Sequence, residues 1–142
     1  MGWFKSVIYA IQCTENGKVY IGCTAKHIAE LRVNEHMNAL KRGDKRVWGE
    51  RCTVKSGWQE DYDKYGPDAF VAYIMEEVDE ADDPFDVEAF YMRKYKANDP
   101  KYGYNYVMKR DRGGNIKIPV KYGFPEMIKE ETHEQGTILL GQ

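Results

Sequence analysis

The stretch SVIYAIQCTENGKVYIG, residues 6–22, constrains the fold more than any other part of this sequence. Two short runs within it, 7–11 and 19–21, are rich in the β-branched and aromatic residues that suit strands. Between the two runs stand Asn16 and Gly17, and both residue types accept the positive φ of a tight turn. The stretch therefore predicts a β-hairpin with one tyrosine in each strand.

Length and composition indicate one globular domain. A chain of 142 residues buries a core without disulfides or structural metals. It has no run of 18 apolar residues and no basic region followed by an apolar one near its start, so neither a transmembrane helix nor secretion is expected. Cys13, Cys23 and Cys52 are odd in number and lack metal-ligand spacing, which indicates free thiols in a reducing, cytoplasmic compartment.

Charge is distributed unevenly along the chain. The net charge of −2 does not by itself suggest a nucleic-acid binder. Residues 26–55 hold eight lysines and arginines against four acidic residues, 59–99 hold four against thirteen, and 100–122 hold six against one. A basic face for a polyanion and a solvated surface of mixed charge both fit this distribution.

The remaining pattern predicts further elements around the hairpin. Gly43 follows a helical segment over 26–42, with Lys41 and Arg42 in the last turn, where cations suit the helix dipole. We expect helices also over 58–65 and 81–96 (with Asp82 or Asp83 as N-cap), a strand over 70–78, a second hairpin joining 107–108 to 116–120, and a short helix or frayed tail over 123–142. This order predicts an α+β domain with a small mixed sheet covered by helices.

Two charged residues occupy the apolar side of the helix over 26–42. At about 100° per residue, Arg32 and His36 fall inside the apolar arc that runs from Ile28 to Met37, and they are stacked one turn apart. The opposite, solvent-facing arc holds Glu30, Asn34, Asn38, Lys41 and Arg42.

The helix over 81–96 shows the same anomaly. Glu88 falls among Phe85, Tyr91, Met92 and Tyr95. A buried charge needs a partner or a wet pocket. One interpretation is an internal Arg32–Glu88 salt bridge, with His36 hydrogen-bonded to a carbonyl. The other is a functional pocket.

Such a pocket suits phosphodiester hydrolysis. A carboxylate can hold a divalent metal, because Mg²⁺ prefers oxygen and takes only one or two protein carboxylates. The guanidinium fork matches the phosphate oxygens, and a histidine or tyrosine can act on the attacking water.

Five segments in order resemble the GIY-YIG nuclease superfamily. The first two, VIY at 7–9 and YIG at 20–22, carry tyrosines eleven residues apart. The others are LRVNEH at 31–36, DKYGPDAF at 63–70 and VEAFYMRKYKANDPKYGYN at 87–105. Val7 departs from the family pattern, which has glycine there, but no presumed catalytic group is missing.

The resemblance implies a small three-stranded antiparallel sheet flanked by helices and a metal-dependent DNA endonuclease that uses one Mg²⁺ or Mn²⁺. For the reaction it implies Glu88 as metal ligand, Tyr9 as general base with Lys18 as helper, and Tyr20 as the residue that orients water or phosphate. Arg32 and His36 would contact the scissile phosphate. Asn105 would hold the site through backbone contacts, and Gly22 would let the chain turn into the following helix. His36 as the base, with Tyr9 only orienting, is the alternative.

The domain expectation is a catalytic unit over 1–106 and a C-terminal extension over 107–142, with a basic hairpin and an acidic tail, in the same compact body. DNA is the expected partner and no membrane is expected. A homodimer would allow both strands to be cut. The alternative function is a catalytically inactive DNA-binding or regulatory protein on the same fold. The candidate DNA contacts are Lys41, Arg42, Lys45, Arg46, Arg51, Lys109, Arg110 and Arg112.

Overall fold

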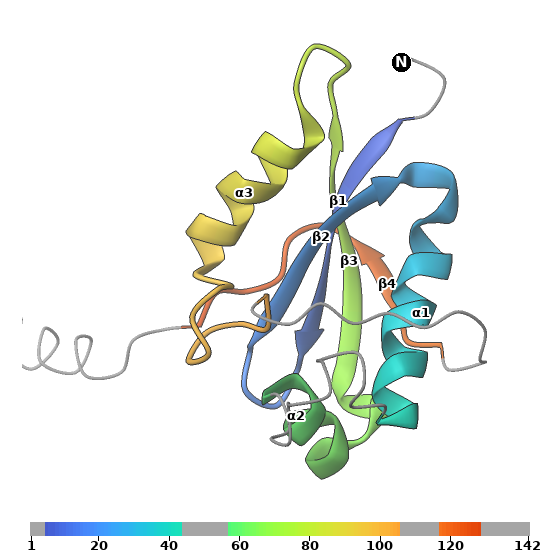
Figure 1. The fold of residues 1–142 in the computed structure, drawn as a ribbon, viewed down its shortest axis with the longest axis vertical. Helices are drawn as coiled ribbons and strands as arrows, with labels where there is room; N and C mark the ends of the chain where they lie inside the picture. The colour runs from blue at the N-terminus through green and yellow to red at the C-terminus, as the bar shows by residue number, and fades with distance from the viewer. Residues whose placement is uncertain (1–4, 44–56, 106–116, 129–142) are drawn as a thin grey trace, which may run out of the picture.

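The computed structural model describes residues 5–43, 57–105 and 117–128 (Figure 1). The predicted hairpin is confirmed: β1 (Ser6–Cys13) and β2 (Val19–Ala25) pair antiparallel. In the turn between them, Gly17 has φ +82° and the Asn16 side chain accepts a hydrogen bond from the backbone N–H of Lys18 at 3.0 Å. The Asn-Gly pair thus supplies both the backbone freedom and the local hydrogen bond that the turn requires.

The predicted helices are confirmed with small shifts at their ends. A single 3-10 turn, Lys26–Ile28, leads into α1 (Ala29–Arg42), which ends where Gly43 adopts φ +64°. The second helix, α2, spans Gly57–Tyr65 and leads through a 3-10 turn, Pro67–Ala69, into strand β3 (Phe70–Val78). The third, α3 (Pro84–Tyr95), has Asp83 as its N-cap, whose side chain accepts from the backbone N–H of Phe85 at 2.9 Å.

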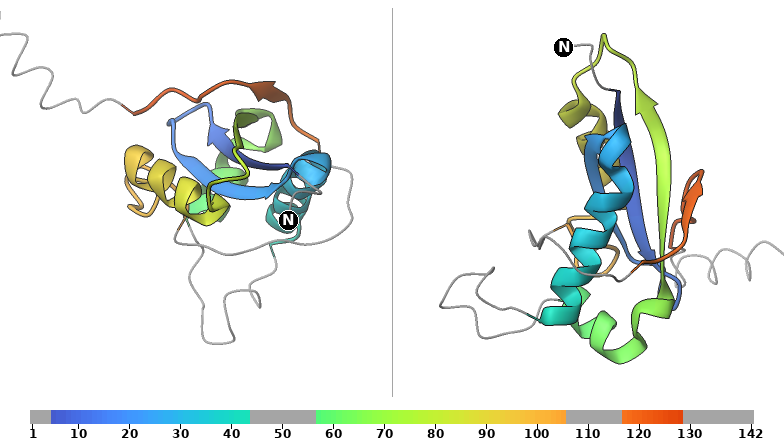
Figure 2. Two further views of the ribbon diagram at one scale, coloured as in Figure 1. Left: turned by 90° about the horizontal axis from the view of Figure 1, so that it is seen from above. Right: turned by 90° about the vertical axis from the view of Figure 1, so that its right-hand side faces the viewer.

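Helices α1 and α3 cover opposite faces of the sheet, as the view from above shows (Figure 2). Alternate residues of β1 point to each side, so one strand serves two cores. The core on the α1 side contains Val7, Tyr9, Ile11, Val33, Met37 and Leu40, and the core on the α3 side contains Ile8, Ala10, Ile21, Tyr91 and Tyr95.

The described sheet has four strands in the order β2-β1-β3-β4. Strands β1, β2 and β3 form an antiparallel unit, but β4 (Val120–Tyr122) pairs with β3 in parallel, so the sheet is mixed. The expectation of a three-stranded antiparallel sheet therefore describes only part of it. Pairing by β4 covers the edge of β3, which would otherwise present unpaired backbone groups.

The described part of the C-terminal extension lies against the sheet. Hydrogen bonds fix it: the backbone N–H of Gly123 donates to the carbonyl of Ile74 at 3.1 Å, and the Tyr95 hydroxyl donates to the carbonyl of Pro125 at 2.8 Å. Residues 123–128 form no helix. The predicted hairpin strand over 116–120 is wrong in its bounds and its partner, since 117–119 form no strand and β4 pairs with β3. The other predicted hairpin strand, 107–108, and its connection 111–115 lie outside the described residues, as does the rest of the tail, and the domain boundary after residue 106 stays a prediction.

Two placements on the helical wheels are wrong. Phe85, taken as facing inward, is 69% exposed, because α3 packs instead through Tyr91 and Tyr95. Asn38, taken as facing solvent, is buried. Within the described ranges no helix is long and apolar enough to cross a membrane. Cys13 and Cys23 are free thiols, as predicted, and Cys52 lies outside the described residues.

Candidate active site

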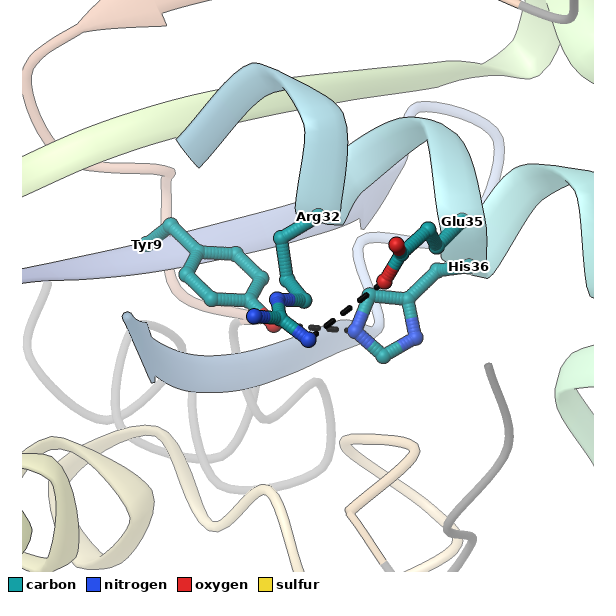
Figure 3. Close-up of polar contacts among 4 residues, drawn as sticks. All are labelled: Tyr9, Arg32, Glu35 and His36. Carbon is teal, nitrogen blue, oxygen red and sulfur yellow. Dashed lines mark hydrogen bonds and ion pairs between the residues drawn. The ribbon is translucent and has the colours of Figure 1, made fainter. Parts of the chain in front are cut away.

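Tyr9 and His36 meet in the layer between β1 and α1 (Figure 3). The Tyr9 hydroxyl and Nε2 of His36 lie 2.9 Å apart, and each side chain is only 2% exposed. The alternation of β1 turns Tyr9 toward α1, and His36 faces the sheet, as its place on the wheel predicts. The structure therefore joins the two groups predicted to act on water.

Gly22 leaves room for the Tyr9 ring. It lies opposite Tyr9 in the β1–β2 pairing, and a Cβ at this position would come within 2.6 Å of the Tyr9 hydroxyl oxygen. The predicted role, a tight turn into the following helix, is wrong, since Gly22 lies within β2 and has no positive φ. The second motif needs a glycine here for space beside a ring.

An aromatic wall backs the pair. The Tyr20 ring stacks on Trp58 of α2 at a centroid distance of 4.8 Å, and Trp58 stacks on Tyr104 at 5.2 Å and 5°. The His36 ring lies 4.7 Å from Tyr20 and 5.5 Å from Trp58. Trp58 is 1% exposed, and its Nε1 has no hydrogen-bond partner in the described part of the chain. Its ring thus contributes stacking surface rather than a hydrogen bond.

The far end of this wall is held by polar contacts. The buried Tyr104 hydroxyl donates to Oδ2 of Asp61 at 2.5 Å, and Nδ2 of Asn16 donates to the same oxygen at 2.8 Å. Burial, and then the hydrogen bond to Asp61, raise the pKa of Tyr104, so its ring stays neutral and donating. Helix α2, the hairpin turn and the loop before residue 105 are thereby fixed to one another.

Arg32 and Glu35 form an ion pair on α1, the helix that also carries His36. Nη1 of Arg32 lies 3.4 Å from Oε1 of Glu35, and their side chains point toward those of Tyr9 and His36 (Figure 3). The Arg32 side chain is 24% exposed, so part of it has access to solvent. The sequence-based alternative of an Arg32–Glu88 salt bridge is not what the structure shows.

Glu88 is half-buried on α3 and makes no ion pair with any described residue. Burial raises the pKa of this carboxyl. Glu88 lies near Cys23 of β2 and affects its titration. Burial raises the pKa of the Cys23 thiol to about 11, and the negative charges of Glu88 and Asp83 contribute to the rise. The described residues contain no cluster of three or more His, Cys, Asp or Glu that could hold a metal.

Asn105 clamps the backbone of β2. Its Oδ1 accepts from the N–H of Ile21 and its Nδ2 donates to the carbonyl of the same residue, both at 2.7 Å. Gly103 supports this loop, since a Cβ there would lie 2.4 Å from Cα of Ala97. The clamp holds the strand between Tyr20 and Gly22, which is the backbone contact expected of Asn105.

Other predicted residues lie elsewhere. Lys18 precedes β2 in the hairpin turn, four residues before the position opposite Tyr9, and no described contact joins it to the pair. Lys41 and Arg42 form the exposed end of α1. The other candidate DNA contacts lie outside the described residues: Lys45, Arg46, Arg51, Lys109, Arg110 and Arg112.

Sequence reasoning missed three contributors. The helical wheel gives no role to Glu35, although it is i+3 from Arg32, a spacing that pairs side chains on a helix. Trp58 and Asp61 were assigned only to a short helix. Their contacts join residues 22 or more positions apart in sequence, and no local pattern predicts such contacts.

Comparison with known proteins gives the family. The model of the GIY-YIG catalytic domain matches residues 5–105, and no curated protein matches the chain. Among solved structures, the catalytic domain of homing endonuclease I-TevI is 28% identical, covering 73% of this chain and 100% of that one, with a TM-score of 0.44. A mutant of the catalytic domain of intron endonuclease I-TevI is 25% identical, covering 77% and 99%, with a TM-score of 0.43. Since the family match spans most of the 142 residues, this chain belongs to the GIY-YIG family and is an endonuclease of that type.

Proposed function

We propose that this chain hydrolyses phosphodiester bonds of DNA at one metal-dependent site, inside the cell. The observation that carries the proposal is the 2.9 Å contact between the Tyr9 hydroxyl and His36 Nε2, with the Arg32 guanidinium on the same helix. The hydroxyl and the imidazole are buried, and the Arg32 side chain on the same helix is 24% exposed. A hydroxyl, an imidazole and a guanidinium are groups that can activate water and bind a phosphate.

Tyr9 and His36 act together on water in this proposal. A free tyrosine has a pKa of about 10, so it is a poor base near neutral pH without help. His36 Nε2 accepts the phenolic proton along the hydrogen bond, and the Tyr9 oxygen removes a proton from the attacking water. The oxygen of that water then bonds to phosphorus as the bond to the leaving oxygen breaks. If His36 is the base alone, Tyr9 only orients the water.

The other residues hold the substrate and the site. Arg32 binds the nonbridging oxygens of the scissile phosphate, for which its fork has the right shape. Tyr20 orients the water or the phosphate, and the wall formed by Trp58 and Tyr104 fixes its ring. Asn105 keeps β2 in register beside them.

Glu88 on α3 makes no described contact with Tyr9, Arg32 or His36, but its carboxylate suits a divalent metal. A half-buried carboxylate whose pKa is raised by burial gains from a neighbouring cation, and one carboxylate is enough for an ion that keeps most of its waters. We propose Mg²⁺ or Mn²⁺. The chemistry that such an ion supplies when bound is neutralisation of negative charge at the phosphate and the leaving oxygen.

The test is cleavage of supercoiled plasmid by the wild type and by Glu88→Ala in Mg²⁺, Mn²⁺ or EDTA. We expect cutting in either metal, none in EDTA, and a loss of at least about a hundredfold in Glu88→Ala. Asp86→Asn, an exposed change on the same helix, is the control and should cut normally. DNA binding without any cutting by the wild type would favour an inactive DNA-binding protein instead.

A further inference from the structure

Glu35 is a buried carboxylate whose ion-pair partner among the described residues is Arg32. The residue is 8% exposed, and its described contact is the 3.4 Å approach to Nη1 of Arg32. Charge-assisted hydrogen bonds between these groups normally measure about 2.7–2.9 Å. Removing a carboxylate from water lowers the stability of the folded state unless strong hydrogen bonds replace the water. The Arg32–Glu35 pair therefore contributes little to stability.

The order of the pair along α1 also argues against a helix-stabilising role. Ion pairs on a helix stabilise best when the acidic residue precedes the basic one. Here Arg32 comes first and Glu35 follows. Helix stability therefore does not account for Glu35.

The position of Glu35 affects both the binding of DNA and the orientation of Arg32. Arg32 would bind a phosphate, and Glu35 places a like charge beside that phosphate. The carboxylate also attracts one nitrogen of the guanidinium, 3.4 Å away, which biases the orientation of the fork and leaves its remaining donors for other partners. The first effect weakens the binding of DNA, while the second orients Arg32 for the reaction, whose geometric demands are strict.

Resting on the proposed nuclease function, we propose that Glu35 is a positioning residue that orients the Arg32 guanidinium at the expense of DNA affinity. It acts through Arg32 and does not touch the substrate. Removing its charge should therefore change binding and cleavage in opposite directions. A merely structural carboxylate would not produce that pattern.

The experiment compares Glu35→Gln with the wild type in two assays. The dissociation constant is measured with a fluorescein-labelled duplex DNA in EDTA, and the cleavage rate constant with supercoiled plasmid in Mg²⁺ under single-turnover conditions. In Glu35→Gln we expect the dissociation constant to fall about threefold or more, because a repulsive charge is removed. We expect the cleavage rate constant to fall about tenfold, because Arg32 is less well oriented.

Two variants and thermal melting serve as controls. Glu30→Gln makes the same charge change at an exposed position of α1 and should leave the cleavage rate unchanged. Glu35→Asp keeps the charge on a shorter side chain, so its affinity should match the wild type while its cleavage rate is intermediate. Melting temperatures identify any variant that loses activity through unfolding.

The possible outcomes separate the role of Glu35 from the proposed nuclease function. A wild type that cuts, with Glu35→Gln behaving like Glu30→Gln, overturns the role of Glu35 and leaves the proposed function standing. A loss of both affinity and rate that follows the loss of thermal stability also overturns it. A wild type that binds DNA without cutting overturns the proposed function, and the role of Glu35 with it.

Discussion

At the scale of single residues, the groups proposed to react are positioned by neighbours that have no chemistry of their own. Gly22 has no side chain, and the Tyr9 hydroxyl occupies the space that a Cβ at this position would fill. Trp58 offers only a ring face, yet both Tyr20 and His36 lie against it. The identity of these neighbours therefore matters as much as that of the tyrosine and the histidine.

Gly22→Ala should abolish most activity without unfolding the chain. The added methyl group displaces the Tyr9 ring, which breaks the contact with His36. Misplacing a reacting group by about 1 Å costs about a hundredfold in rate. The measurement is plasmid cleavage in Mg²⁺, with Thr24→Ala in the same strand as control. Near-normal cleavage by Gly22→Ala would show that the Tyr9 position is not critical.

Residue patterns predicted some site members and not others. Arg32 and His36 stood out because a charged side chain on an apolar helix face is costly and therefore informative. Glu35 gave no such signal, since it lies at the margin of that face and its burial depends on the surrounding tertiary structure. The contact between Tyr9 and His36 joins residues 27 positions apart, which periodicity alone does not predict.

At the scale of elements, helix and strand positions followed from local signals. The Asn-Gly turn, Asp83 as N-cap and Gly43 as the helix end all act within a few residues. The parallel pairing of β4 with β3 does not follow from local signals, because composition indicates a strand without indicating its partner. Phe85 was misplaced for a related reason: a wheel gives the spacing of apolar residues but not which of them meet the sheet.

A hydrogen bond between α3 and β3 predicts how stability depends on pH. The Tyr91 hydroxyl donates to Oε1 of Glu76 at 2.5 Å. Burial first, and then this bond, raise the pKa of Tyr91 from 10.0 to about 12. Between these values the folded chain keeps a proton that the unfolded chain has released. The free energy of unfolding therefore falls as the pH rises through this window.

Tyr91→Phe should flatten that alkaline decline. The variant lacks the titrating hydroxyl, so its melting temperature should fall less than that of the wild type between pH 10 and about 12. Tyr122→Phe, at a residue that is 77% exposed, should behave as the wild type does. Parallel curves for the wild type and Tyr91→Phe would rule out this contribution.

At the scale of the whole molecule, the charge pattern indicates how DNA approaches. The described acidic residues concentrate in 59–99, which includes α3, whereas α1 ends in the exposed cations Lys41 and Arg42. We propose that DNA lies along the end of α1, and that a homodimer, if one forms, cuts the two strands with one site each. The two-fold arrangement stays a prediction.

Lys41→Gln should weaken DNA binding and its salt dependence together. Loss of one phosphate contact lowers the slope of log affinity against log salt by about 1. The measurement is binding of labelled duplex DNA in EDTA across a salt series. Lys94→Gln, an exposed change on α3, should leave both affinity and slope as they are. The same loss in both variants would place the DNA elsewhere.

A double-mutant cycle tests whether Tyr9 and His36 form one water-activating unit. Single-turnover cleavage of supercoiled plasmid in Mg²⁺ is measured for the wild type, Tyr9→Phe, His36→Gln and the double variant, with melting curves for each. Groups that act as a unit give strongly non-additive effects. The double variant should be no slower than the slower single variant. Losses that multiply would contradict it and assign the two residues independent roles.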